Sequence, residues 1–365
     1  MESRTVFKLF AVSQPGIEEI TLSELEDLGI EGKVVPGGAL FKGGLRELYL
    51  SNLWLRTANR ILVRVASFKV TTFSELVKKV SRYPWDIYFP FPQKVKVRVT
   101  CKKSKLYHSK AVAERVLKGI HHRLKHQLEE AKFEDEGTSI VVRIENDFCT
   151  VSVNSSGASL HKRGYRVVET EAPIRETLAS AMILASGWDR KTPLIDPFCG
   201  SGTIPIEAAL IGANIPPGFK RDFAFMKWKN FDEVLWNQLL AEAKDGITEF
   251  PQVFGFDISK EAVDAAVKNA GAAGVKISFK VASFPEDGLP PLAYIVTNPP
   301  YGKRIKVNPE EIYRDFGRWL KKVFSGFKVA FLSPSNRLAS VTGIKCKRVT
   351  TFSNGGIRVN LYCSR

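Results

Sequence analysis

The stretch "PLIDPFCGSGTIPIEAAL", residues 193–210, joins a short apolar run to an apolar helical segment through a glycine-rich turn. The run ends at Asp196, and the turn contains Gly200 and Gly202. Glycines let the backbone approach a ligand closely, and the amino end of a helix favours an anionic group. The pattern predicts a strand, a turn and a helix, with a ligand bound beyond the strand end. By themselves, the two glycines are explained equally well by a tight turn that binds nothing.

The alternation of strands and helices continues along the C-terminal half of the chain. We expect helices over 177–187, 203–213, 260–274 and 310–325, and strands over 193–198, 253–259, 276–283, 292–300 and 328–335. Such alternation predicts a doubly wound α/β sheet that is mostly parallel and covered on both faces. Two further strands surround Asn354-Gly355-Gly356, which predicts an antiparallel hairpin at the C-terminal end.

The first half of the chain has a different pattern. Residues 1–65 read as strand, helix, strand, helix, strand, which predicts an α+β module of ferredoxin-like order. Residues 66–155 repeat this mixture of helices and strands. The polar segment 161–176 links this half to the next, and residues 214–246 form an aromatic-rich insertion that carries its own helix.

The chain is strongly basic: its 365 residues include 54 Lys or Arg against 38 Asp or Glu, a net charge of +16. This charge favours a polyanionic partner, and nucleic acid is the common one, although a basic surface without a partner is the alternative. Residues 93–126 hold 11 basic residues and one acid, on an alternating strand and an amphipathic helix. We predict phosphate contacts from Lys102, Lys103, Lys105, Lys110, Arg115, Lys118 and Arg163.

Several other classes of protein are disfavoured by composition. No apolar run reaches the roughly 18 residues of a membrane span, and the first residues lack a signal-peptide pattern. We therefore expect a cytoplasmic protein without a membrane partner. The five cysteines are odd in number and far apart, which argues against a disulfide framework or a zinc site. His122 and His126 share a helical stretch, but a basic surface helix explains them better than a metal site does, so we expect no metal.

A second ligand contact is predicted at Asp257, where a carboxylate at a strand end could accept hydrogen bonds from a ribose. In nicotinamide-binding folds this acid follows the glycines by about 20 residues. Here Asp257 lies 55 residues after Gly202, and Pro205 stands where a third glycine would be expected. The chain also lacks the G-K-[ST] signature of a nucleoside-triphosphate loop. A dehydrogenase or an NTPase is therefore disfavoured.

A further strand end carries the sequence "IVTNPPYGKRI", residues 295–305. The apolar run stops at Asn298-Pro299-Pro300-Tyr301, and neither proline has a backbone N–H with which to continue a ladder. The segment therefore presents one amide and one aromatic ring at a rigid strand end. A plain strand-ending turn is the alternative, which the position of this segment in the series of strands disfavours.

The segments "DPFCGSGTIPIEAAL" and "TNPPYGKR" together resemble the S-adenosylmethionine-dependent amino-methyltransferases. "LHKRGYR", "APIRETLA" and "ANIPPGFKRDFAFMKW" narrow the resemblance to the THUMP-domain RNA guanine-N2 methyltransferases, close to the bacterial 23S rRNA large-subunit group and its tRNA-modifying relatives. "QPGIEEITLSELEDLGI" and "LYLSNLWLRTANRILVRV" match the first half of that family, so the resemblance covers nearly the whole chain. It implies a ferredoxin-like module at 1–65, a THUMP RNA-binding domain at 66–160, a linker at 161–176 and a Rossmann-like methyltransferase domain at 177–365.

The resemblance implies S-adenosylmethionine as the cofactor. Its methionine part would be surrounded by Asp196, Phe198, Gly200, Ser201 and Gly202. Thr177, with its neighbours in "PIRET", residues 173–177, would help cap the amino-acid end. Its ribose and adenine would be held by Asp257 and Ile258. Where this class often has an Asp for the adenine amino group, this chain has Ser283, and whether Ser283, Glu286 or Asp287 meets the adenine stays open.

The resemblance also implies how the target amine is methylated. The lone pair of an exocyclic amine is delocalised into its base, and two acceptors on its N–H groups would localise it. These would be the Asn298 side-chain oxygen and the Pro299 carbonyl, whose direction Pro300 fixes. Tyr301 would offer a flat face to a base removed from its stack.

Four functions fit these residues to different degrees. Guanine-N2 methylation of 23S rRNA is the first, and the same reaction on tRNA is its nearest rival. A DNA adenine-N6 methylase shares N-P-P-Y, but the THUMP-like half favours RNA. A non-catalytic RNA-binding assembly factor is disfavoured by the intact glycines and N-P-P-Y. No obligate protein partner is inferred.

Overall fold

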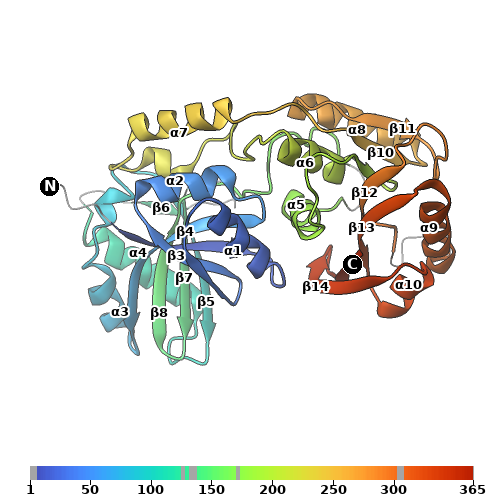
Figure 1. Cartoon of the computed structure of the whole chain (residues 1–365). Coiled ribbons are helices and arrows are strands. Elements are labelled where there is room, and N and C mark those ends of the chain that lie inside the picture. The colour runs from blue at the N-terminus through green and yellow to red at the C-terminus, as the bar shows by residue number, and fades with distance from the viewer. Residues whose placement is uncertain (1–5, 125–127, 131–137, 170–172, 302–307, 365) are drawn as a thin grey trace.

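The computed structural model of the chain describes residues 6–124, 128–130, 138–169, 173–301 and 308–364. The described strands form two sheets, one of eight strands in the N-terminal half and one of seven in the C-terminal half. Figure 1 shows the two halves side by side, with helices α5 (Glu176–Ala185) and α6 (Thr203–Gly212) between the two sheets. Within the described residues, no helix has both the length and the apolar character needed to cross a lipid bilayer.

The N-terminal sheet has the strand order β2-β3-β1-β4-β8-β7-β5-β6. Its strands are β1 (Phe7–Ser13), β2 (Gly32–Val35), β3 (Gly38–Gly43), β4 (Ala58–Lys69), β5 (Lys94–Lys102), β6 (Glu129–Glu130), β7 (Thr138–Glu145) and β8 (Phe148–Asn154). Its helices are α1 (Glu18–Asp27), α2 (Leu45–Trp54), α3 (Phe73–Val80) and α4 (Ser109–His121). The long strand β4 pairs antiparallel with β1 and with β8, so a single sheet runs through the two modules expected from the sequence.

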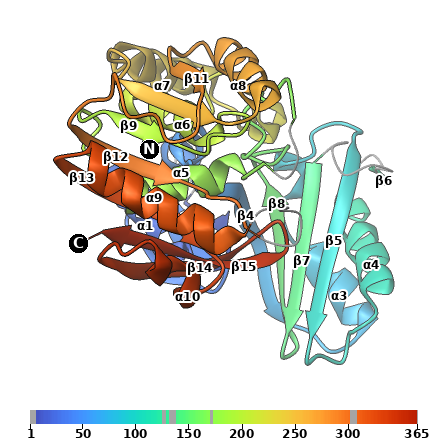
Figure 2. The same ribbon diagram turned by 90° about the vertical axis from the view of Figure 1, so that its right-hand side faces the viewer.

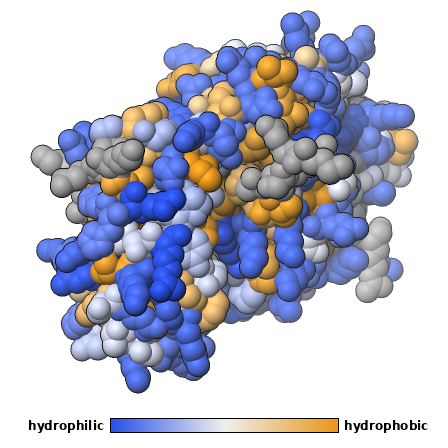
Figure 3. All heavy atoms as spheres, turned by 90° about the vertical axis from the view of Figure 1, so that its left-hand side faces the viewer, coloured by the Kyte–Doolittle hydropathy of each residue, from blue (hydrophilic) through white to orange (hydrophobic). Residues whose placement is uncertain are grey.

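The local sequence explains the basic surface of this half. In α4, one face buries Val112, Val116 and Ile120, and α4 packs beside α3. The opposite face of α4 exposes its cations, which are Lys110, Arg115 and Lys118. Figure 3 shows that the side of the molecule carrying these helices presents mostly hydrophilic side chains. The amphipathic spacing thus sorts apolar residues into the core and cations onto the surface.

The C-terminal sheet has the strand order β11-β10-β9-β12-β13-β15-β14. Neighbours from β11 to β13 are parallel, whereas β15 pairs antiparallel with both β13 and β14. The strands are β9 (Leu194–Asp196), β10 (Val253–Asp257), β11 (Ser278–Val281), β12 (Leu292–Thr297), β13 (Gly326–Ser333), β14 (Cys346–Asn354) and β15 (Ile357–Ser364). This confirms the predicted doubly wound, mostly parallel sheet with an antiparallel hairpin at its end.

Helices cover both faces of the C-terminal sheet, as the near-continuous apolar strands predict. Tyr294 and Val296 of β12 pack into one core with α5 and α6. Ala293 and Ile295 of the same strand face the opposite core. That second core is closed by α9 (Pro309–Val323) and α10 (Asn336–Val341), and Figure 2 shows α9 lying across the sheet. The helix α8 (Lys260–Ala273) follows β10.

The insertion predicted at 214–246 packs on the N-terminal half, which the sequence did not indicate. Figure 1 shows its helix α7 (Glu233–Asp245) beside α2. The Tyr49 ring of α2 stacks on Phe225 at 4.6 Å and meets Trp236 edge-on at 5.8 Å. The Asp232 backbone N–H donates to the Tyr49 hydroxyl at 2.9 Å. These aromatic residues therefore join the C-terminal half of the chain to the core of the N-terminal half.

We expect Trp236→Ala to destabilise the N-terminal core by about 3–5 kcal/mol, because it leaves a cavity beside packed aromatic rings. Val234→Ala in the same helix is the matched control, since Val234 is 80% exposed, and it should change stability by no more than about 0.5 kcal/mol. Urea denaturation followed by circular dichroism measures both. Equal midpoints for the two variants would contradict the docking of α7.

Candidate active site

The site lies where the order of the parallel strands reverses. The chain runs outward from β9 to β10 and β11, then returns to the other side of β9 with β12 and β13. In an open α/β sheet, ligands bind beyond the carboxyl ends of the strands at such a switch point. Asp196 ends β9, Asp257 ends β10, and Asn298 directly follows β12. The structure therefore brings these three predicted site residues to one edge of the sheet.

The glycine-rich turn is held in place by Asp257. The Gly200 N–H donates to Asp257 Oδ2 at 2.9 Å, and the Ser259 N–H donates to Oδ1 at 3.0 Å. A carboxylate oxygen can accept more than one hydrogen bond, so Asp257 can hold the turn and still receive a ligand hydroxyl. Asp257 therefore fixes the turn in addition to its predicted contact with a ribose.

Glycine is needed at the two positions of the turn for different physical reasons. Both adopt left-handed backbone conformations, with φ of 51° at Gly200 and 85° at Gly202. A Cβ added at Gly202 would lie 3.0 Å from the Ala266 side chain and 3.1 Å from the Phe279 ring, so the packing of α8 excludes a side chain there. At Gly200, no described atom lies within 4 Å of an added Cβ. Gly202 thus serves packing, while Gly200 leaves open space beside the turn.

Asp196 links the strands on which the site is built. Its side chain is 1% exposed, and Oδ1 accepts from the Thr297 hydroxyl at 2.6 Å and from the Phe198 N–H at 3.1 Å. Burial, with a smaller contribution from Asp257, raises the pKa of Asp196 to about 7, against the lowering effect of these two hydrogen bonds. Asp196 therefore fixes the end of β12 immediately before Asn298. Thr297, its partner, was not predicted as a site residue.

The N-P-P-Y segment presents an acceptor that lacks a partner. Asn298 Oδ1 is buried, and no atom of the described chain donates a hydrogen bond to it. A buried acceptor without a hydrogen bond costs free energy. An unpaired Asn298 Oδ1 is therefore typical of a site where a ligand supplies the donor. The Tyr301 hydroxyl accepts from Asn354 Nδ2 at 2.6 Å, which ties the ring to the β14–β15 hairpin. Residues 302–307, the end of the quoted motif, lie outside the described residues.

Apolar side chains flank this edge of the sheet. The Phe198 ring packs edge-on against Phe284 at 5.4 Å, and Ile258, directly after Asp257, is 75% exposed. Ser283 is exposed beyond the end of β11. Glu286, one of the two acids offered as alternatives to Ser283, forms an ion pair with Lys322 of α9 at 2.7 Å. Which of the three residues meets the adenine stays a prediction.

Arg163 is a correction to the predicted phosphate contacts. Its guanidinium is buried, donates to the carbonyl oxygens of Leu160 and Arg56, and pairs with the buried Glu207 of α6 at 3.5 Å. A side chain enclosed in this way cannot reach an RNA backbone. The sequence showed its charge but not its partner, which lies far along the chain. The role of Arg163 is to anchor the linker to α6.

The rest of the linker also contacts the glycine-rich turn. Arg166 donates to the Thr203 hydroxyl at 3.0 Å and to Glu176 at 2.9 Å. Asn269 of α8 accepts from the Val167 N–H at 2.9 Å and donates to the Ser201 carbonyl at 3.1 Å. The polar linker expected from the sequence is thus bound to the candidate site. Thr177, predicted to cap the cofactor, is buried in the first turn of α5.

The other predicted phosphate contacts lie on the surface of the N-terminal half. Lys102 ends β5, Lys103 and Lys105 lie in the loop that follows, and α4 carries Lys110, Arg115 and Lys118. All six residues are exposed. Lys102 also pairs with Glu145 at 3.4 Å. Within the described ranges, no group of three His, Cys, Asp or Glu side chains is arranged so that it could hold a metal ion. His126, which was considered together with His122, lies outside those ranges.

Three family models match this chain. The RlmL ferredoxin-like domain matches residues 8–62, the THUMP domain matches 70–154, and the RMKL-like methyltransferase domain matches 163–362. The last of these covers more than half of the chain. The chain belongs to the RMKL-like methyltransferase family. This membership confirms the resemblance noted in the sequence and makes the protein a methyltransferase.

Relatives of this methyltransferase extend over both of its halves. The Bacillus subtilis protein YpsC, named as a candidate RNA methyltransferase, is 38% identical over 98% of this chain and 95% of its own length. The ribosomal RNA large subunit methyltransferase K/L of Methylococcus capsulatus is 34% identical over 97% of this chain, which spans about half (50%) of that relative. SMU.472, crystallised with S-adenosylhomocysteine (SAH), is 34% identical with a TM-score of 0.87 and 98% coverage of both chains.

We expect Gly202→Ala to destabilise this methyltransferase by roughly 1–3 kcal/mol, because it combines a left-handed φ with a Cβ forced against α8. Gly271→Ala is the matched control: Gly271 lies in α8 with open space around an added Cβ. That change should be neutral or stabilising by up to about 1 kcal/mol. Differential scanning calorimetry compares the two, and equal melting temperatures would show that the turn tolerates a side chain.

Proposed function

We propose that this methyltransferase transfers a methyl group from S-adenosylmethionine to the exocyclic N2 amine of a guanine in 23S rRNA. The observation that carries the proposal is the buried, unpartnered Asn298 Oδ1 at the carboxyl end of β12. It stands before two prolines and a Tyr whose hydroxyl is held by Asn354. A buried acceptor at a switch point, next to an aromatic ring, suits an amine attached to a flat base.

The methyl donor is S-adenosylmethionine, as family membership and the SAH bound to SMU.472 confirm. When bound, it would supply a methyl group to an attacking amine lone pair, with the cofactor sulfur leaving as a neutral thioether. The residues present fit it: Gly200 leaves open space beside the turn, and Ile258 exposes an apolar side chain next to Asp257. Asp257 would accept from the ribose, Ile258 would contact the adenine, and the turn from Gly200 to Gly202 would hold the methionine part.

The chain's own groups then orient the amine. Asn298 Oδ1 accepts one N–H of the amine, and the Pro299 carbonyl accepts the other. These two hydrogen bonds localise the nitrogen lone pair, and preorganised acceptors cost no rearrangement at the moment of reaction. Pro300 has no N–H and fixes the direction of that carbonyl. Tyr301 supports the face of the flipped base, and its hydrogen bond to Asn354 sets the plane of the ring.

No side chain is required as a general base. The methylated nitrogen is briefly cationic and acidic enough to lose its proton to water. The pKa of about 7 at Asp196 would suit a base, but this carboxyl is 1% exposed and bonded to Thr297 and Phe198. Its geometry makes Asp196 a positioning residue for the end of β12. Asp196 therefore acts on the reaction through Thr297 and the backbone.

RNA as the substrate is supported by three independent features. The THUMP model matches residues 70–154, and the named relatives include an rRNA methyltransferase. The exposed cations of β5 and α4 lie within the THUMP region. Phosphate contacts of this kind position a nucleic acid without reading its bases. Selection of the base then falls to the catalytic half.

The identity of the product tests this proposal. The protein would be incubated with isotopically methyl-labelled S-adenosylmethionine and unmethylated 23S rRNA, tRNA or duplex DNA, and the nucleosides separated by mass spectrometry. We expect labelled N2-methylguanosine from 23S rRNA. Label found only in tRNA, or N6-methyladenine from DNA, would contradict it. No label with any substrate, despite cofactor binding, would favour a non-catalytic assembly factor.

In the same assay, Asn298→Ala should reduce the rate of transfer by roughly 10²–10³, the cost of losing one aligned group. The affinity for S-adenosylmethionine should be unchanged, because Asn298 is assigned to the amine. Asn298→Asp keeps an acceptor oxygen at the same position and should retain more activity than Asn298→Ala. Near-parental turnover in Asn298→Ala would rule out this role for N-P-P-Y.

A further inference from the structure

The loop between β5 and α4, residues 103–108, carries two exposed rings side by side. Tyr107 is 67% exposed, the largest exposed fraction among the described Phe, Tyr and Trp side chains. The centroid of its ring lies 4.1 Å from that of the His108 ring, and His108 is exposed as well. A single exposed ring needs no explanation, so its surroundings decide whether it has a role. Neither ring was assigned to the cofactor or to the amine above.

The loop is held in place by the turn between β7 and β8. The Lys105 N–H donates to Asp147 Oδ1 at 2.7 Å, and the Asp147 N–H donates to Ser104 Oγ at 3.1 Å. The Ser104 hydroxyl in turn donates to the Lys102 carbonyl oxygen at 2.8 Å. Leu106 is buried in the core of the N-terminal half. The backbone is thus anchored immediately before the two rings, and a preorganised loop loses little conformational freedom when it binds a partner.

The charge around the rings suits an anionic chain. Residues 102–110 contain four lysines and no acid, and all four lysines are exposed. At the end of β7, Glu145 pairs with Arg143 at 2.7 Å and with Lys102 at 3.4 Å, so its charge is offset. Phe148, the residue after Asp147, adds another exposed ring at this end of the sheet. Aromatic rings and cations therefore occur together on one short, fixed segment.

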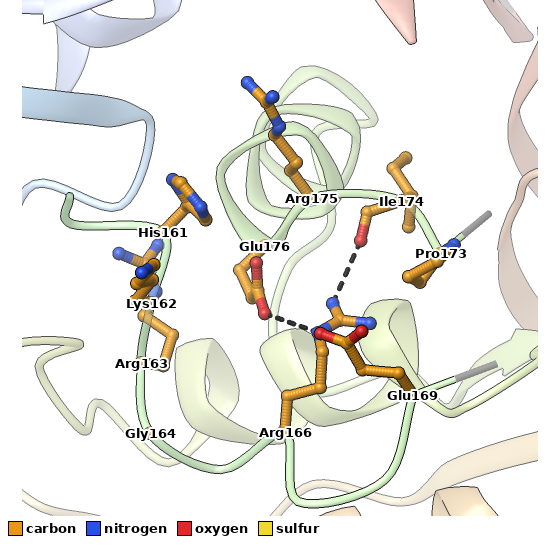
Figure 4. A pocket seen from close by; sticks show the side chains of 10 residues that line it. All are labelled: His161, Lys162, Arg163, Gly164, Arg166, Glu169, Pro173, Ile174, Arg175 and Glu176. Carbon is orange, nitrogen blue, oxygen red and sulfur yellow. Dashed lines mark hydrogen bonds and ion pairs between the residues drawn. The ribbon is translucent and has the colours of Figure 1, made fainter. Parts of the chain in front are cut away.

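The arginines of the linker do not offer a comparable surface, because they are engaged within the protein. Figure 4 shows Arg166 directed at Glu176 and at the Ile174 carbonyl oxygen, to which it donates hydrogen bonds. Arg163 is buried and pairs with Glu207. The exposed loop before α4 is thus better suited than these arginines to contact an RNA.

Rings beside lysines form the combination that binds single-stranded nucleic acid. The lysines follow the backbone phosphates, and each ring offers a flat face on which a base of any sequence can stack. In a duplex the faces of the bases are covered by their neighbours, whereas bases in loops and bulges can be splayed out. An exposed Tyr therefore gains a contact from an unpaired base that a paired base does not give.

We propose that Tyr107, with His108 against it, stacks on an unpaired base of the RNA substrate. Lys103 and Lys105 contact the phosphates on either side of that base. The proposal rests on the proposed function only in taking RNA as the substrate. It adds a base contact to the N-terminal half, where the predicted contacts involve phosphates alone.

Tyr107→Ala and Tyr107→Phe test the stacking contact in the full-length protein. Affinity would be measured by fluorescence anisotropy for a single-stranded RNA and for a blunt duplex RNA with the same number of phosphates. Tyr107→Ala should weaken binding of the single strand by roughly 5- to 150-fold, the effect of losing one stacked base. Tyr107→Phe keeps the ring and should stay within twofold of the parent. Both variants should bind the duplex with parental affinity.

The salt dependence separates the ring from the lysines. Tyr107→Ala removes no charge, so the slope of log affinity against log salt should be unchanged. Lys103→Gln should instead reduce that slope by about 0.7 on the single strand. Phe91→Ala is the matched control, because Phe91 is 44% exposed and precedes β5, at the opposite end of that strand from Tyr107. It should keep parental affinity for both RNAs, and melting temperatures show that each variant is folded.

Two results would overturn the proposal. Parental affinity of Tyr107→Ala for the single strand would show that no base rests on the ring, and would leave the ring to a protein partner. Equal losses on the single strand and the duplex would show that the ring only supports the loop. Neither result depends on methyl transfer, so a product other than N2-methylguanosine would refute the proposed function and leave this test intact.

Discussion

The hydrogen bond between Asp196 Oδ1 and the Thr297 hydroxyl, at 2.6 Å, fixes the relation on which the rest of the site depends. It joins the carboxyl ends of β9 and β12, the two strands between which the sheet reverses its order. Parallel strands alone bring such ends to one edge but leave their loops free to diverge. The buried Asp196 carboxyl fixes the position of the glycine-rich turn relative to the N-P-P-Y segment. Its raised pKa is the electrostatic consequence of that burial.

Buried polar contacts connect the C-terminal half to the N-terminal half, because Arg163 donates to the Arg56 carbonyl oxygen at 2.6 Å and also pairs with Glu207. Glu207 of α6 receives Tyr165 and Ser180 as hydrogen-bond donors and Arg163 as an ion-pair partner. Removing one partner of a buried ion pair leaves an uncompensated charge, so these residues act as a unit. The insertion adds an aromatic connection through Tyr49. A further contact joins the halves where the Thr350 hydroxyl of β14 donates to the Gly16 carbonyl oxygen. Several separate contacts thus fix the N-terminal half against the half that carries Asn298.

Much of this architecture follows from local sequence patterns. Apolar runs alternating with helical spacing predicted the parallel sheet, and Asn354-Gly355-Gly356 predicted the hairpin between β14 and β15, both of which the structure confirms. The switch-point residues were identified because glycines, an acid or a double proline followed a strand. These signals lie within a few residues of the feature that they predict. Periodicity and turn chemistry suffice to find them.

The parts that were missed depend on contacts between distant residues. Arg163 looked like a surface cation because its partner Glu207 is 44 residues further along the chain. The hydrogen bond from Asn354 to Tyr301 and that from Thr297 to Asp196 likewise join segments that no local pattern connects. The docking of α7 on α2 depends on aromatic packing across the two halves. Charge and aromatic content could be read from the sequence, but their placement required the fold.

A crystal structure of the protein with SAH would show whether this strand edge holds both the cofactor and the amine. We expect the ribose hydroxyls within hydrogen-bond distance of Asp257 and the methionine part along the turn from Gly200 to Gly202. We also expect Asn298 Oδ1 to remain without a protein donor and to face the sulfur. A ligand bound elsewhere, or an Asn298 oxygen that accepts from a protein group in that complex, would refute the assignment of this site.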